Sequence, residues 1–488
     1  MARLSLKTLG EAAKTAQVPA YDPTTVKTGI LHLGVGAFHR AHQAVFMDDL
    51  LAKDPRWGIA GAQVINNTQL RDALAPQDFL YTVGLRSGDE AKLRVVGSLR
   101  SLVVPDGSDA LIEKMCDPTI RIVSITVTEK GYCYDPATGD LAMNHPGIAA
   151  DLANPHQPTT LPGFITEALR RRRAAGTAPF TVLSCDNLPS NGITTRKVVT
   201  QFAESVDKDL AKFIAAEVAF PGTMVDRIVP ATTEQDIAAV SAQLGLEDAW
   251  PVVTEPFIQW VIEDHFTNGR PDYESLGAEM VKDVEPYERM KHRMLNGSHS
   301  MIAYLGYLAG YETVAETMAD RAFEKLIFDF MTEELAPTLH VPGVDLGGYR
   351  DALIARFKNT ALKHRTWQIA MDGSQKLPQR MLGALRDRLE SGESFDRLAL
   401  GIAAWMRYVT GRDEHEAAID VRDPLADRLK KIADETGRHA GALTRAYLSV
   451  EEVFGHDLGQ NPAVASAVEA ALTKLLDQGA AATVKTYI

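Results

Sequence analysis

Residues 28–52, TGILHLGVGAFHRAHQAVFMDDLLA, decide how the chain begins to fold. The apolar run Thr28–Leu33 is typical of a buried strand, and it leads through Gly34-Val35-Gly36 into a helix predicted over 37–52. In this order of strand, glycine turn and helix, the glycines let the backbone approach a phosphate and the helix N-terminus favours its negative charge. The stretch therefore predicts a dinucleotide-binding unit, although His39 stands where the usual motif has its third glycine.

A second strand, predicted over 59–65, follows at the distance expected of a strand-helix-strand unit. The Asp or Glu that usually binds the ribose of NAD at the end of this strand is not evident, because the chain continues as Asn66-Asn67-Thr68. An amide can also hydrogen-bond a ribose hydroxyl, so Asn66 is the candidate ribose ligand. No arginine occupies that place either, and Arg71 is the nearest one. We therefore expect NAD, with NADP less favoured.

The rest of the chain divides into an α/β part and a helical part. Strand-like and helical runs alternate in the first part, which indicates a Rossmann-type parallel sheet. The strand-like runs lie at Leu93–Val96, Arg121–Val127 and Phe180–Ser184, and a helix is predicted over 159–173. A shift in composition near residue 284 introduces apolar residues at helical spacing, for example over 323–335 and 463–476. We predict a dinucleotide-binding domain over 1–283 and an all-helical substrate and catalytic domain over 284–488.

Two predicted strands end in polar clusters. Glu129 follows the strand that begins at Arg121, and Asn187 follows the strand that begins at Phe180. Ligands of such sheets lie at the carboxyl ends of the strands, so both residues are candidates for the site. The alternative is that each is a capping residue or a turn former.

The segment Tyr287–Ser300 gathers a carboxylate, a lysine, an amide and an imidazole within fourteen residues. On an α-helix at about 100° per residue, Glu288, His299 and Asn296 fall about 60°, 80° and 140° from Lys291. A buried lysine has a lowered pKa and can act as general base on an alcohol, while amide and imidazole groups hold the reacting oxygen. This set suits metal-free interconversion of an alcohol and a ketone. The alternative is a surface helix with scattered charges, and the dipeptide Asn296-Gly297 is itself a turn signal.

The composition excludes several classes of protein. The 488 residues carry a formal charge of −13, which argues against nucleic acid or an anionic membrane as a partner. The cysteines at 116, 133 and 185 form neither a disulfide framework nor a zinc pattern, and this suits a reducing compartment. No signal peptide or membrane-spanning run is evident. We expect a cytoplasmic enzyme of small molecules, a monomer or a small homo-oligomer.

Several longer motifs resemble one known family. They are GVGAFHRAHQ at 34–43, TEKGY at 128–132, SCDN at 184–187, MVDRIVP at 224–230 and the segment 291–299. Together they resemble the polyol-specific long-chain dehydrogenases, the mannitol dehydrogenase family, over nearly the whole chain. The resemblance implies a nicotinamide cofactor and no metal. It implies the following residues: Lys291 as general acid/base, Asn187 and Asn296 as oxyanion ligands, His299, Asp226 and Glu288 at the substrate, and Glu129 on the route of the proton to solvent. The glycine turn and the second strand give the candidate cofactor ligands Gly34, Gly36, Ala37, Phe38 and Asn66. At Asn66 the chain departs from those members that carry an acidic ribose ligand.

Within the family, the segment His364–Arg380 most resembles the members that reduce fructuronate to mannonate. It is rich in cations, with Arg365, Lys376 and Arg380, and arginine can clamp a carboxylate with two hydrogen bonds. We therefore expect Arg365 and Lys376 to bind the carboxylate of a sugar acid. Two alternatives remain: a mannitol 2-dehydrogenase type of enzyme that acts on a neutral polyol, and a cofactor-binding protein without turnover.

Overall fold

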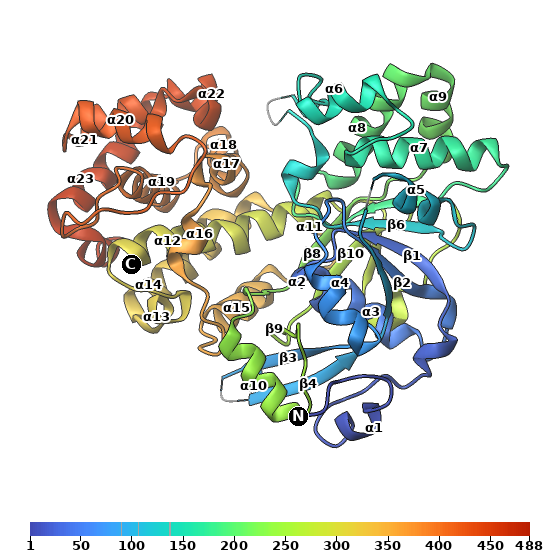
Figure 1. The fold of residues 1–488 in the computed structure, drawn as a ribbon. Coiled ribbons are helices and arrows are strands. Elements are labelled where there is room, and N and C mark those ends of the chain that lie inside the picture. Colours follow the sequence, from blue (N-terminus) through green and yellow to red (C-terminus); the bar gives the residue numbers. More distant parts are fainter. Residues whose placement is uncertain (89, 106, 136–137) are drawn as a thin grey trace. The chain divides into compact units, whose positions relative to one another are not determined.

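A computed structural model describes residues 1–88, 90–105, 107–135 and 138–488 of the chain. It forms two compact units, Met1–Glu285 and Pro286–Ile488. The first is built on β-sheets and the second is helical, as the colours of Figure 1 make visible along the chain. The predicted fold class, a Rossmann-type domain followed by a helical domain, is confirmed.

A five-stranded sheet organises the first unit, and all its neighbouring strands run parallel. Its order is β5 (Leu99–Val103), β2 (Gly58–Ala62), β1 (Thr28–Leu33), β6 (Ile122–Ile125) and β7 (Thr181–Ser184). Along β1, Leu31 and Leu33 face one apolar core while Ile30 faces the other. A sheet buried on both faces needs near-continuous apolar strands, which is what these segments supply.

Helices cover both faces of this sheet. One core contains side chains of α5, α7 and α8, and the other contains side chains of α3 and α4. The helices of this unit are α1 (Leu9–Ala12), α2 (Ala37–Ala41), α3 (Gln43–Leu50), α4 (Gln69–Leu74), α5 (Asp109–Cys116), α6 (Pro146–Ala153), α7 (Leu161–Ala174), α8 (Asn191–Val206), α9 (Lys208–Glu217) and α10 (Glu234–Leu244). The single helix predicted over 37–52 was wrong, because His42 leaves helical geometry at φ −122° and ψ −91° and separates α2 from α3.

Two smaller sheets complete the first unit. One contains β4 (Glu90–Val96), β3 (Tyr81–Ser87) and β9 (Val252–Thr254), and the other contains β11 (Glu279–Val281), β10 (Gln259–Glu263) and β8 (Thr223–Asp226). The predicted strand Leu93–Val96 therefore does not belong to the parallel sheet. It is part of β4, which pairs antiparallel with β3, because a connection this short cannot cross over to a parallel neighbour.

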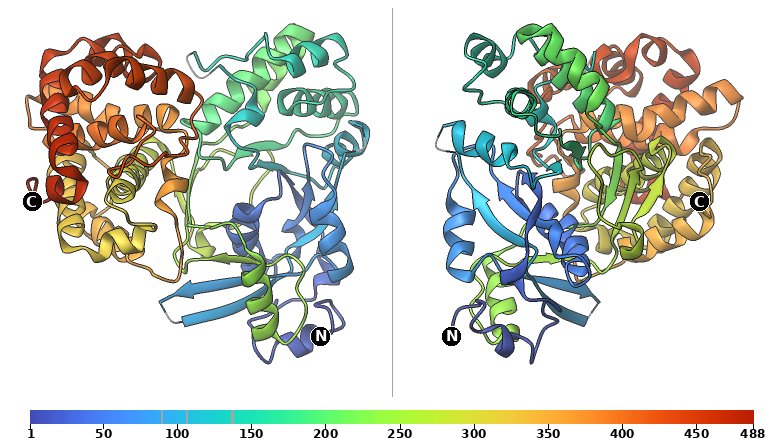
Figure 2. Two further views of the ribbon diagram at one scale, coloured as in Figure 1. Left: turned by 60° about the vertical axis from the view of Figure 1, so that its left-hand side comes forward. Right: turned by 90° about the vertical axis from the view of Figure 1, so that its right-hand side faces the viewer.

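The second unit is helical in its described residues, and Figure 2 shows its helices from two further directions. The α-helices are α11 (Glu285–Met290), α12 (Ser298–Leu308), α13 (Val314–Ala319), α14 (Arg321–Asp329), α15 (Leu346–Phe357), α16 (Thr366–Ala370), α17 (Gly373–Leu377), α18 (Gly383–Ser391), α19 (Asp396–Tyr408), α20 (Ala426–Thr436), α21 (Ala440–Leu448), α22 (Glu451–Gly459) and α23 (Pro462–Val484). Three π-helical segments interrupt them: η6 (Lys291–Gly297), η7 (Phe330–Leu335) and η9 (Pro378–Leu382).

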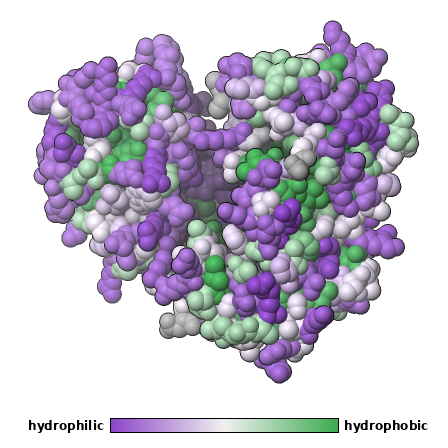
Figure 3. All heavy atoms as spheres, in the orientation of Figure 1, coloured by the Kyte–Doolittle hydropathy of each residue, from purple (hydrophilic) through white to green (hydrophobic). Residues whose placement is uncertain are grey.

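Polar side chains dominate the surface seen in Figure 3, with apolar residues scattered among them. The large apolar side chains that are exposed lie far apart in the sequence: Met1, Ile65, Met143, Ile193, Trp250 and Ile488. Among the described residues, no helix combines the length and the apolar character that a membrane span requires.

Candidate functional site

The glycine turn after β1 lies where the strand order of the main sheet reverses, between β2 on one side and β6 on the other. Gly34 adopts φ +85°, and a Cβ there would stand 2.2 Å from the carbonyl oxygen of Thr126 at the end of β6. A side chain is therefore excluded on two grounds. Gly36, by contrast, would tolerate a Cβ, which would stand at an ordinary contact distance of 3.9 Å from the carbonyl oxygen of Gly34. The turn leaves room for a ligand at the point where such sheets bind nucleotides.

His39, at the place of the third glycine, packs beneath the turn. Its ring stacks on His32 with centroids 3.4 Å apart. His32 is held by Ser124 and Thr126, each 2.8 Å from a ring nitrogen, and the Thr126 hydroxyl donates to the carbonyl of Gly34 at 2.9 Å. Burial lowers the pKa of His39 to about 3 and that of His32 well below its usual value. Neutral His32 thus supports the glycine turn through Thr126, and neutral His39 packs against His32.

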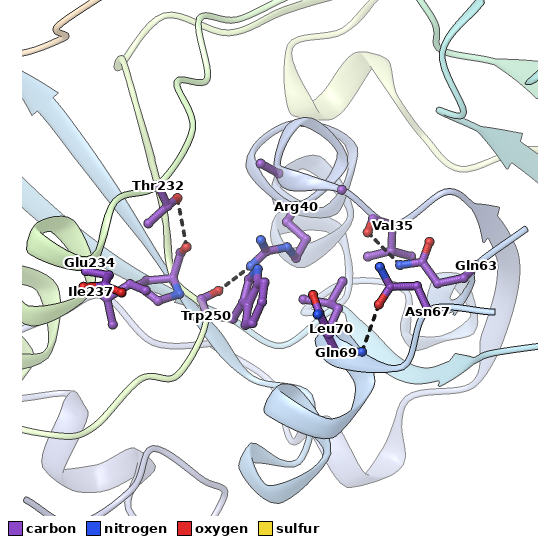
Figure 4. Close-up of a pocket in the computed structure, with 13 residues that line it drawn as sticks. Val35, Arg40, Gln63, Asn67, Gln69, Leu70, Thr232, Glu234, Ile237 and Trp250 are labelled. Carbon is purple, nitrogen blue, oxygen red and sulfur yellow. Dashed lines mark hydrogen bonds between the residues drawn. The ribbon is translucent and has the colours of Figure 1, made fainter. Parts of the chain in front are cut away.

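A pocket of about 410 Å³ opens beside the glycine turn (Figure 4). Gly36 and Ala37, two of the candidate cofactor ligands, line it together with Gln63 at the end of β2. Asn67 lines it rather than its neighbour Asn66, which is exposed. Phe38 is not among the lining residues and stacks on His42 with ring centroids 5.0 Å apart.

The lining residues that were not predicted from the sequence include Arg40 on α2 and Trp250, just before β9. The Arg40 guanidinium donates to the carbonyl oxygen of Trp250, as the dashed line in Figure 4 marks. The two residues are 210 positions apart, and no local pattern in the sequence connects them.

Asp186 joins the ends of β6 and β7 and was also missed. Its carboxylate accepts hydrogen bonds from the backbone N–H of Val127 at 2.8 Å, from that of Thr128 at 3.0 Å and from the Tyr132 hydroxyl at 2.7 Å. Burial raises the pKa of Asp186 to about 6, against the opposing effect of these donors. A carboxyl group that titrates near neutral pH at the end of a parallel strand is a candidate for a functional role.

Asn187 and Glu129, the predicted candidates from the same strand ends, are both exposed side chains of the first unit. Glu129 begins a short 3-10 helix, η4 (Glu129–Tyr132), directly after Thr128. Thr128 adopts φ 67° and ψ 165°, a region that residues other than glycine rarely occupy. The hydrogen bond from the Thr128 N–H to Asp186 stabilises this conformation, and Glu129 follows directly in the chain.

Asp226 closes β8, buried, opposite Gln259 of β10. The next residue, Arg227, donates to the carbonyl oxygens of Ala41 and Glu255. Through these bonds the end of β8 is tied to α2, which follows the glycine turn.

The lysine segment of the second unit is one continuous helix with a π-helical centre. Lys291 is the first residue of η6, Gly297 is its last, and α12 continues from Ser298. The angles expected for a plain α-helix were therefore wrong. Hydrogen bonds in a π-helix connect residues five apart, so Asn296 lies one turn from Lys291 on the same side of the helix. The turn signal Asn296-Gly297 does not break the helix, because Gly297 is helical at φ −63° and ψ −48°.

Gly297 lets a second π-helix approach this segment. A Cβ at Gly297 would stand 2.7 Å from the carbonyl oxygen of Arg380, on η9. The Arg380 guanidinium in turn donates to the Ser300 hydroxyl at 3.0 Å and to the carbonyl of Asn296 at 3.4 Å. The two π-helices are thus joined from both directions.

The imidazoles of this region are neutral. Lys291, Glu288, Asn296 and His299 are all buried, with at most 8% of any of them exposed. Burial lowers the pKa of His299 well below its usual value, and nearby His364 and Arg380 act in the same direction. The His299 ring packs 4.5 Å from that of Phe357. A neutral His299 can donate or accept a hydrogen bond, but it does not serve as a charged acid at neutral pH.

The three cations of the segment 364–380 lie in different surroundings. Arg365 is exposed at the start of α16. The Lys376 amine donates to the carbonyl oxygens of Met371 at 2.6 Å and Ile369 at 3.5 Å. Arg380 is bonded to the lysine segment, through the Ser300 hydroxyl and the carbonyl of Asn296. Among the described residues, no cluster of three or more His, Cys, Asp or Glu could hold a metal.

Comparisons with known proteins find the two domains of one family, one in each unit. The mannitol dehydrogenase Rossmann domain matches residues 28–275, and the mannitol dehydrogenase C-terminal domain matches residues 283–476. D-mannonate oxidoreductase of Escherichia coli is 48% identical over 469 residues, 95% of this chain and 96% of its own. An uncharacterized oxidoreductase of the same species, YdfI, is 50% identical over 475 residues, 97% of this chain and 98% of its own.

One solved structure is similar along its whole length. It is Pseudomonas fluorescens mannitol 2-dehydrogenase in a ternary complex with NAD and D-mannitol, with a TM-score of 0.90 and 40% identity over 99% of each chain. A substrate-free D-sorbitol dehydrogenase follows, with a TM-score of 0.88 and 34% identity over 99% of this chain and 100% of its own.

Proposed function

The chain belongs to the mannitol dehydrogenase family of oxidoreductases, and we propose that it reduces D-fructuronate to D-mannonate, reversibly, with NADH as the hydride donor. The resemblance noted from the sequence motifs is thereby confirmed at the level of the family. The substrate, the cofactor and the roles of individual residues are the proposal.

The residues around the glycine turn fit a dinucleotide. Gly34 permits the close turn, Gly36 leaves its outer side open, and the pocket beside Ala37 and Asn67 has the room and the amide groups for an adenosine ribose. The solved relative that holds NAD supports the same cofactor here. When bound, NADH supplies the hydride that the carbonyl carbon of the substrate receives.

Lys291 donates a proton to the carbonyl oxygen as the alcohol forms, and takes it back in the reverse reaction. A buried ammonium group loses its proton more readily than an exposed one, which suits this exchange. The amide group of Asn296 donates a hydrogen bond to the same oxygen while negative charge develops on it. For Asn187, in the first unit, the family resemblance implies the role of a second oxyanion ligand. The π-helical turn supports this assignment, because it brings Asn296 to the side of the helix that carries Lys291.

The observation that carries the substrate proposal is the position of Arg380. Its guanidinium is bonded to Ser300 and to the carbonyl of Asn296, beside the proposed catalytic amide. A sugar acid brings a carboxylate that a polyol lacks, and a charge-assisted hydrogen bond to it contributes about 1.5–3 kcal/mol. The Lys376 amine is already held by backbone carbonyls, so we assign the principal contact to Arg380, with Arg365 and Lys376 in support.

A substrate panel with NADH tests this proposal: fructuronate, tagaturonate, fructose and xylulose. We expect wild-type kcat/KM for fructuronate to exceed that for fructose by at least about tenfold to a hundredfold. Arg380→Gln should reduce the ratio of the two kcat/KM values, mainly by lowering kcat/KM for fructuronate. Arg365→Gln and Lys376→Met test whether these two cations also contribute to the preference for the acid substrate.

Arg386→Gln is the matched control, because Arg386 is bonded to Asp457 on α22 and not to the lysine segment. It should leave the ratio of the two substrates unchanged. A wild-type enzyme that turns over fructose, or oxidises mannitol, as well as it handles the uronate would reject the proposal in favour of a mannitol 2-dehydrogenase type of activity.

A further inference from the structure

Arg40 is a buried cation without an ion pair in the described part of the chain. Only 2% of it is exposed, and its side chain makes one hydrogen bond, to the carbonyl of Trp250. The carboxylate with the largest electrostatic effect on Arg40 is that of Asp248. Its hydrogen bonds come from other donors, namely the backbone N–H groups of Thr82 and Trp250 and the side-chain amide of Gln77. Burial lowers the pKa of Arg40 to about 10, so it stays charged at neutral pH.

Its Nε is also buried and has no hydrogen-bond partner in the described structure. A buried donor without a partner costs free energy, and a buried charge without a partner costs more. Tyr81, whose ring centre lies 5.2 Å from the guanidinium, offers partial compensation through its π-electrons. Arg40 lines the pocket described above, and an anion bound there would neutralise its charge and accept hydrogen bonds from its guanidinium.

The pocket around Arg40 has the composition of a phosphate subsite. In Figure 4, Arg40 and Asn67 line the same space, between the glycine turn and Trp250. The end of β2 offers amides, Gln63 and Asn67, where an NAD-selective sheet offers a carboxylate that repels a 2′-phosphate. Glu234 is the one acidic residue among those lining the pocket, and it is exposed at the start of α10, where water screens its charge.

We propose that this pocket takes the 2′-phosphate of NADPH, with Arg40 as the phosphate-binding residue, so that the protein uses NADPH as well as NADH. The inference rests on the proposed dinucleotide site but goes beyond it. It also replaces Arg71, the arginine nearest in sequence, which is paired with Asp72 and does not line the pocket.

The test measures binding of two nucleotides to the full chain by calorimetry: 2′,5′-ADP, which carries the 2′-phosphate, and 5′-AMP, which lacks it. Wild-type protein should bind 2′,5′-ADP about tenfold to a hundredfold more tightly than 5′-AMP. Arg40→Gln should remove this difference and leave the affinity for 5′-AMP unchanged. Arg71→Gln is the matched control and should keep the difference.

Asn67→Asp provides a second variant, because Asn67 is exposed and its replacement spares the fold. The added carboxylate should weaken 2′,5′-ADP more than 5′-AMP, because it repels the 2′-phosphate that only the first carries. Equal affinities of the wild type for the two nucleotides would overturn the inference, as would an Arg40→Gln protein that weakens both alike. Failure of 5′-AMP itself to bind would instead count against the proposed dinucleotide site, so the two outcomes are distinct.

Discussion

Replacing Gly297 by Ala tests whether the close approach of the two π-helices serves catalysis. The new Cβ would stand 2.7 Å from the Arg380 carbonyl oxygen, whereas ordinary contacts begin at 3.4 Å. The backbone of η9 and η6 must therefore separate by about 0.7 Å. Because this oxygen belongs to a helix and not to a flexible side chain, the displacement reaches Asn296 and Arg380 themselves.

Two opposing effects set the expected stability. Forcing a methyl group into a packed site costs about 1–3 kcal/mol. Alanine in a helix gains about 1 kcal/mol over glycine. The net change in the free energy of unfolding should thus be a loss of about 0–2 kcal/mol. Catalysis should suffer more, since a misplacement of about 1 Å costs on the order of a hundredfold in rate, and we expect kcat to fall by about tenfold or more.

Gly383→Ala is the matched control. Gly383 is helical at φ −62° and ψ −45°, and a Cβ there would meet its nearest neighbour, an Arg293 nitrogen, at an ordinary 3.5 Å. This variant should keep its kcat and gain up to about 1 kcal/mol of stability. Steady-state kinetics with fructuronate and urea denaturation measure both quantities. A Gly297→Ala protein with the kcat and stability of the Gly383→Ala control would refute the argument that close approach is required.

Three other outcomes are expected. Lys291→Ala should lower kcat by about 10²–10⁴-fold while NADH still binds in a fluorescence titration, and a variant with wild-type turnover would remove Lys291 from its role. Asp186 has a raised pKa in the folded state, so its stabilising contribution is present below about pH 4 and is lost as the pH rises through about 6. The unfolding free energy of the wild type, measured against Asp186→Asn, should fall across this range, and a flat difference would contradict the shift. Dialysis against EDTA should leave kcat intact, and a loss that zinc restores would contradict a metal-free mechanism.

The sequence predicts the first β-α-β unit because that unit is local. The apolar run Thr28–Leu33, two glycines and a second apolar run need no distant partner to be recognised. The strand at Leu93–Val96 was assigned to the wrong sheet because a short apolar run carries no information about which strand pairs with it. Only the brief connection to β3 shows that it must pair antiparallel.

The candidate site was harder to predict because its partners are remote in sequence. Lys291 and Asn296 could be named from their chemistry, yet their alignment depends on a π-helix, which leaves no hydrophobic period to detect. Arg40 and Trp250 meet only in the folded unit. The importance of Asp186 likewise comes from donors at the end of another strand. Sequence alone named its neighbour Asn187 instead.

The π-helical turn makes the spacing of the chain, rather than the identity of the intervening residues, the determinant of how Lys291 and Asn296 align. Adding one residue between them would turn Asn296 away from Lys291 by about 100°. Conservative substitutions at Met294 or Leu295 keep the count and so keep the alignment. A library that lengthens this segment by one residue should therefore yield far fewer active clones than one that varies its composition, and natural relatives should tolerate exchanges here while excluding single-residue insertions.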